Sequence, residues 1–288
     1  MTAPDTLTAT LLTDQTAEAA RAPETNQTAE AGHTAEAAPG SQPRTLVVLP
    51  SLGTAVEPLW ARAAALLPRD WTVVGVDLPG HGRSAPLGEG PGASRTMEDF
   101  AAQVLEAVRT QVPELTTFAV AGDSVGGAIA LQLALDHPDL VEAAVPFCTG
   151  AQIGSPEAWE DRAAHVEREG TATMVEGSIQ RWFAPGFPDA QPEVADPLLE
   201  SLRQTDDVSY AAVCRALAAF DVRDRLSALR PPVLAVAGAH DQPTPPASLQ
   251  VIADGVQQGR AVVVEEAAHL VPAEAPARTA QLLTEFLG

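Results

Sequence analysis

The chain has 288 residues, of which 45% are hydrophobic, so it can bury the core of one enzyme-sized domain with an insertion. Its formal net charge is −21, and because nucleic acids and anionic membranes repel such a surface, we exclude both as partners. The two cysteines are too few for a disulfide framework, and the sequence contains no secretory signal and no transmembrane run. We therefore expect a cytoplasmic protein.

The first 43 residues differ from the rest. Residues 1–13 contain an alternating apolar pattern, which predicts an edge strand. Residues 14–43 form a degenerate Thr-Ala-Glu-Ala repeat without valine, isoleucine, leucine or aromatic residues. Such a segment buries too little surface to offset its ordering entropy, so we predict that it is disordered.

From residue 44 onward, apolar runs alternate with helical periodicity. The expected strands are 45–49, 71–76, 117–121, 141–147, 233–237 and 260–264. The expected helices between them are 55–67, 97–112, 126–135, 246–253 and 273–286. This alternation predicts an α/β fold, with a mostly parallel central sheet and helices on both faces, built from residues 44–150 and 221–288. Residues 151–220 show only helical patterns, which indicates a helical cap inserted over the sheet.

The sharpest motif is Gly122-Asp123-Ser124-Val125-Gly126, which fits G-x-S-x-G and lies between a predicted strand and a predicted helix. This context is that of the nucleophile elbow of α/β-hydrolases, so Ser124 is the candidate nucleophile. Aspartate also serves as a nucleophile in this fold, but the flanking glycines centre on Ser124 and leave Asp123 out of register. The effect of Asp123 beside the nucleophile stays open.

A serine nucleophile needs a base, and the base needs an acid that orients it. Of the six histidines, His269 has the expected position, in a loop after the last predicted strand. Asp241 follows the strand before it, and the order Ser124, Asp241, His269 is that of α/β-hydrolases. Competing acids are Asp221 and Asp224, which we interpret as helix-start residues.

An oxyanion hole in this fold uses two backbone N–H groups. One belongs to the residue after the nucleophile, Val125. The other belongs to the loop after the first core strand, Pro50-Ser51-Leu52-Gly53-Thr54, where we assign Leu52.

Several stretches resemble the 3-oxoadipate enol-lactonases of the β-ketoadipate pathway. They are the Ser51-Leu52-Gly53-Thr54 loop, the cap entry from Cys148 to Trp159, and Gln180-Arg181-Trp182-Phe183-Ala184-Pro185-Gly186-Phe187. The resemblance runs from about residue 45 to the C-terminus, and Asp123 departs from the small or apolar residue expected there.

The resemblance implies a hydrolase of aromatic-compound catabolism that opens a small anionic lactone, 3-oxoadipate enol-lactone, without a metal or organic cofactor. An acidic protein that binds an anion needs local positive charge, so Arg181 and Arg162, with Trp182 beside the ring, are the expected substrate contacts. Other carboxylesterases, C–C bond hydrolases and a non-catalytic ligand receptor stay open as alternatives. The sequence does not fix the oligomeric state.

Overall fold

The computed structural model describes residues 6–13, 44–88 and 95–288, so the repeat segment 14–43, predicted to be disordered, lies outside the described residues. Within these ranges the strands form one seven-stranded sheet in the order β1-β3-β2-β4-β5-β6-β7. The strands are β1 (Ala9–Leu11), β2 (Arg44–Leu49), β3 (Trp71–Val76), β4 (Phe118–Asp123), β5 (Val141–Phe147), β6 (Val233–Gly238) and β7 (Gly259–Val264). Among the strands of the described residues, only β1, at the edge beside β3, pairs antiparallel, and the other pairs are parallel. The predicted α/β fold with a mostly parallel sheet is thus confirmed.

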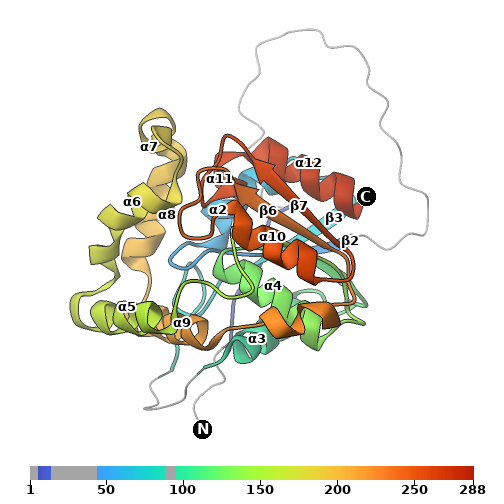
Figure 1. Cartoon of the computed structure of the whole chain (residues 1–288), viewed down its shortest axis with the longest axis horizontal. Coiled ribbons are helices and arrows are strands. Elements are labelled where there is room, and N and C mark those ends of the chain that lie inside the picture. The colour runs from blue at the N-terminus through green and yellow to red at the C-terminus, as the bar shows by residue number, and fades with distance from the viewer. Residues whose placement is uncertain (1–5, 14–43, 89–94) are drawn as a thin grey trace.

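Helices cover both faces of the sheet (Figure 1). On one face α2 contacts α11 and α12, and on the other α3 contacts α4. Their bounds are α2 (Val56–Ala64), α3 (Met97–Gln111), α4 (Val125–Asp136), α10 (Pro246–Gly255), α11 (Val271–Glu274) and α12 (Pro276–Leu287). The helix predicted over 273–286 is confirmed from Pro276 onward as α12, but its predicted start is wrong, because the chain breaks at Ala275 and restarts with Pro276. Proline lacks the N–H that a helix interior needs, but it suits a first turn.

Helices also fill the connection between β5 and β6, and α5 to α9 gather at one side of the sheet (Figure 1). They are α5 (Pro156–Glu169), η1 (Thr171–Met174), α6 (Val175–Trp182), α7 (Phe187–Ala190), α8 (Pro192–Gln204), α9 (Asp207–Ala219) and η2 (Arg223–Ala228). We call α5 to α9 the cap. Helices α5 and α9 pack on each other, while α8 contacts α6 and the core helix α2. The cap is therefore joined to the core domain by packing as well as by the chain.

The parallel strands direct their carboxyl ends to one edge of the sheet. The loops after β2, β4, β6 and β7 carry Leu52, Ser124, Asp241 and His269, respectively. In open α/β sheets this edge is where ligands bind. The fold thus brings residues from four distant parts of the sequence to one place.

Candidate active site

Ser124 occupies a sharp turn between β4 and α4. Its φ of 54° is in the left-handed region, which non-glycine residues adopt only at a cost in strain. The flanking glycines allow this turn: a Cβ on Gly122 would collide with the carbonyl oxygen of Gly126. A Cβ on Gly126 would lie 2.6 Å from the carbonyl oxygen of Pro50. The G-x-S-x-G spacing is therefore a steric requirement of this turn.

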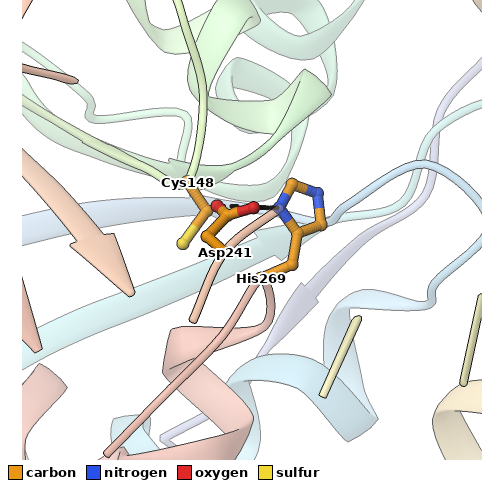
Figure 2. A group of neighbouring side chains, drawn as sticks. All are labelled: Cys148, Asp241 and His269. Atoms are coloured by element: carbon orange, nitrogen blue, oxygen red, sulfur yellow. Dashed lines mark hydrogen bonds and ion pairs between the residues drawn. The ribbon is translucent and has the colours of Figure 1, made fainter. Parts of the chain in front are cut away.

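Asp241 and His269 are in direct contact. His269 Nδ1 lies 3.0 Å from both Asp241 Oδ1 and Oδ2, and both side chains are buried. Figure 2 shows the Nδ1 side of the His269 ring facing the carboxylate of Asp241. Burial disfavours ionisation of Asp241, but the neighbouring His269 and two hydrogen bonds from Thr244 outweigh it, so the pKa of Asp241 lies below its usual value. The aspartate is thus held as an anion against the ring.

Cys148, the residue after β5, lies beside this pair (Figure 2). Its Sγ and the ligand-type atoms of Asp241 and His269 lie within 4.8 Å of one another, a spacing that a metal ion could use. However, burial raises the pKa of the Cys148 thiol well above its usual value, and the thiol donates to the carbonyl oxygen of Ala268 at 3.4 Å. A metal needs a deprotonated thiolate, so the donor set fits a metal poorly.

The other histidines with described surroundings lie elsewhere. His81 is buried, stacks on Tyr210 and bonds the carbonyl oxygen of Pro79, and burial lowers its pKa to about 4. His137 directly follows the last residue of α4, and His165 contacts Thr173 on the cap. The competing acid Asp221 is exposed and ion-paired with Arg223 at 2.6 Å. The structure therefore pairs His269 with Asp241 and gives Asp221 a different partner.

A cavity of about 370 Å³ lies between this edge of the sheet and the cap. Ser124, His269 and Leu52 line it from the core domain. All three predicted substrate contacts, Arg162, Arg181 and Trp182, line the same cavity from the cap. This volume is in the range of small-molecule sites.

The two arginines of the cavity, Arg162 and Arg181, form no salt bridge with a carboxylate of the described residues. Arg162 lies 4.7 Å over the ring of Trp159, and Arg181 folds back over Gly177 of its own helix. Partial burial, and then the like charge of Arg162, lower the pKa of Arg181. Two cations close to each other in one cavity favour an anionic ligand between them.

The expected oxyanion donors belong to the loop after β2 and to the start of α4. Val125 is the first residue of α4, so its N–H has no partner inside that helix. Leu52 is in the loop after β2, where the N–H of Thr54 donates to the carbonyl oxygen of Ser51 at 3.0 Å and shapes the turn.

Sequence reasoning missed three side chains of this site. Tyr210 of α9, the only tyrosine of the chain, is buried in the cavity wall. Burial raises the pKa of Tyr210 to about 12, while the charge of Arg162 opposes that rise. Thr244 donates to Asp241, and Glu274 bonds the loop that carries His269. Two features of the sequence could have indicated these residues: Tyr210 is the sole tyrosine, and Thr244 comes three residues after the acid Asp241.

Asp123 also lies fully buried beside the nucleophile. Neither of its oxygens has a hydrogen-bond partner among the described residues, although the Ser51 side chain is nearby. Burial, and then the charges of Asp241 and Glu274, raise its pKa well above the usual value. Burial therefore favours the neutral carboxylic acid form of Asp123.

Comparison with known proteins agrees with this geometry. The family model of the alpha/beta hydrolase fold matches residues 44–276. The chain belongs to this family. As an α/β-hydrolase, it is 31% identical over 232 residues to 3-oxoadipate enol-lactonase 2 of Acinetobacter baylyi, covering 80% of this chain and 84% of that protein. The resemblance to enol-lactonases found in the sequence is thus confirmed.

Solved structures of other α/β-hydrolases are similar over most of their length. The enol-lactonase from Burkholderia xenovorans LB400 superposes with a TM-score of 0.79 at 28% identity, covering 87% of this chain and 93% of that one. A malate-bound thermophilic esterase from Thermogutta terrifontis superposes with a TM-score of 0.77 at 28% identity, covering 85% and 89%. No helix in the described part of this hydrolase has the length and hydrophobicity to cross a membrane.

Proposed function

We propose that the protein is a serine hydrolase that opens a small carboxylated enol-lactone, 3-oxoadipate enol-lactone, to give 3-oxoadipate. One observation carries the proposal: a single cavity holds Ser124 and His269 on the core side and two arginines on the cap side. The similarity to two enol-lactonases, at 31% and 28% identity, supports the same substrate class. The cytoplasm and the β-ketoadipate pathway are the corresponding setting, with the anionic lactone as partner and neither nucleic acid nor membrane.

In this mechanism Ser124 attacks the lactone carbonyl, and His269 takes its proton through Nε2, since Nδ1 faces Asp241. Asp241 orients the ring and stabilises the imidazolium. The N–H groups of Leu52 and Val125 stabilise the oxyanion. The acyl–oxygen bond then breaks, and the ring oxygen leaves as an enolate, which is a good leaving group and takes the proton from His269 to become a ketone. Water, deprotonated by His269, releases the acid from Ser124.

Arg181 and Arg162 would bind the free carboxylate, and Trp182 would pack against the ring. Charge-assisted bonds from arginine suit a carboxylate because the guanidinium donates in a fork. Both arginines come from cap helices, α6 and α5, so the cap sets substrate choice while the core domain performs the chemistry. No residue in this scheme needs a cofactor.

A broader carboxylesterase, or a C–C bond hydrolase of the same fold, is the second candidate. The similarity to the Thermogutta terrifontis esterase favours the first of these, because the same triad hydrolyses many esters. That the solved esterase holds malate, itself a small carboxylate, fits a site built for small anions.

The test is an assay of the purified protein on 3-oxoadipate enol-lactone and on a neutral aryl acetate. We expect a kcat/KM for the lactone that far exceeds the value for the ester. Good ester turnover without lactone turnover would favour the esterase instead. Ser124→Ala should lower kcat by about 10⁴–10⁶-fold, whereas Ser201→Ala, at a half-buried serine of α8 whose hydroxyl donates to the carbonyl oxygen of Pro197, is the matched control. Full biological activity of Ser124→Ala would indicate a non-catalytic receptor.

A further inference from the structure

One acidic side chain joins the cap to the loop that carries His269. Glu274 is the last residue of α11, five positions after His269. Its Oε1 accepts from the N–H of Ala268 at 2.9 Å, and its Oε2 accepts from the N–H of Ala184 at 2.7 Å. Ala268 directly precedes His269, and Ala184 follows the cap helix α6. The two oxygens of one carboxylate thus hold two segments that lie far apart in the sequence.

Main-chain bonds connect the same two segments. The carbonyl oxygen of Trp182, at the end of α6, accepts from the N–H of His269 at 3.1 Å and from the N–H of Leu270 at 3.3 Å. Of these contacts only those of Glu274 use a side chain, whereas the others join main-chain atoms. A substitution at Glu274 can therefore remove its part of the connection. Trp182 and His269 both line the cavity, so any movement here alters the reacting geometry.

Only a group with two acceptors fits this position, because both partners of Glu274 are N–H donors. Glutamine offers one acceptor and turns an NH₂ donor toward the second N–H. Burial raises the pKa of Glu274 to about 7, although the two N–H bonds and the neighbouring His269 oppose that rise. An acidic side chain kept where packing alone would favour an apolar residue points to a role for its two acceptor oxygens.

We propose that Glu274 is a positioning residue that fixes the cap and His269 relative to each other, so that the base faces Ser124 when the cap is seated. This proposal rests on the proposed role of His269 as the base. It does not depend on which ester or lactone the enzyme cleaves.

The experiment compares Glu274→Gln and Glu274→Ala with the wild type and with Glu266→Gln, an exposed glutamate of the same loop. We would measure kcat and KM on a neutral aryl acetate, the rate at which a fluorophosphonate labels Ser124, and Tm. Both Glu274 variants should lower kcat and the labelling rate in parallel by about 10–100-fold, as small misplacements of a catalytic group do. KM should change much less, and Glu266→Gln should match the wild type.

Ala184→Pro provides a second, independent variant, because it removes the cap-side N–H without touching Glu274. When Glu274→Gln is added to Ala184→Pro, the new amide can turn its one acceptor to Ala268 without opposing a second donor. The loss in kcat caused by Glu274→Gln should therefore be smaller there than in the wild type. Equal losses in both backgrounds would overturn the link to the cap.

The outcomes separate this proposal from the proposed function. If the wild type hydrolyses the ester and Ser124 is labelled, but the Glu274 variants lose only Tm and keep kcat, Glu274 is a structural residue and the positioning role is wrong. If the wild type neither hydrolyses nor is labelled, the hydrolase mechanism itself fails.

Discussion

The imidazole of His269 is placed symmetrically on Asp241, with Nδ1 3.0 Å from each carboxylate oxygen. Thr244 fixes that carboxylate from the other side: its hydroxyl donates to Oδ2 at 2.7 Å and its N–H donates to Oδ1 at 3.0 Å. The aspartate therefore cannot rotate without losing a bond. Its orientation, and that of the ring, is set by a residue three positions along the same loop.

Thr244→Val should lower kcat because it removes the hydroxyl that holds Asp241 while nearly keeping the side-chain shape. A hydrogen bond to a charged group contributes about 1.5–3 kcal/mol, so we expect a loss of about tenfold or more. The measurement is kcat on an aryl acetate, with Thr244→Ser as the variant that keeps the hydroxyl. Equal kcat for valine and serine at this position would show that Thr244 does not support the acid.

Asp123→Asn should stabilise the protein at high pH without changing kcat. Burial favours the protonated form of this carboxyl in the folded protein, whereas the unfolded chain ionises it at its usual pKa. Its raised pKa thus costs stability that grows as pH rises above the usual carboxyl range. We expect a gain in unfolding free energy of at least about 1 kcal/mol at pH 8, which vanishes near pH 4.

Urea unfolding at both pH values checks this expectation, with Asp139→Asn, an exposed aspartate paired with Arg230, as control. A large drop in kcat for Asp123→Asn would instead mean that this carboxyl takes part in the reaction.

The parts of the site that follow strand ends were predictable from sequence. Ser124, Asp241 and His269 each lie just after a strand, and a parallel sheet brings such positions to one edge whatever the packing details. The glycines around Ser124 added a steric signature that few other structures require. For these residues, local pattern and chain order suffice.

Residues that act across elements were not predictable in this way. Glu274 contacts Ala184 over 90 positions, and Tyr210 reaches the cavity from the far cap helix α9. No local periodicity encodes such contacts, since they depend on how the cap packs on the sheet. The break at Pro276 was missed because the apolar pattern continues through it, although proline itself gave the signal.

Arg181→Gln should weaken binding of an anionic substrate selectively. Loss of one charge-assisted bond raises KM for the carboxylated lactone by about 10–100-fold, while kcat/KM for a neutral aryl acetate stays near the wild-type value. Steady-state kinetics on both substrates provide the measurement. Arg168→Gln, on the exposed part of α5 beside Glu169, is the matched control. Equal effects on both substrates would assign Arg181 to cap packing.

The stability of the protein should depend on pH through Glu274. Burial raises the pKa of this residue to about 7, above the usual 4.5. Between about pH 4.5 and pH 7 the folded protein holds a proton that the unfolded chain has released, so the free energy of unfolding falls as pH rises through this window. Asp241 changes the free energy of unfolding with pH in the opposite direction, because its pKa is lowered. Its effect falls below this pH window.

Glu274→Gln removes the titrating carboxyl at this position. The fall in the free energy of unfolding with rising pH should therefore become smaller by up to about 3 kcal/mol. The variant therefore gains stability relative to the wild type on going from pH 5 to pH 8, even though the lost hydrogen bond lowers its stability at every pH. Urea unfolding at half-unit steps of pH measures the difference between the two curves, and that difference cancels groups common to both. Glu266→Gln should run parallel to the wild type, and a parallel Glu274→Gln curve would show that Glu274 keeps an ordinary pKa.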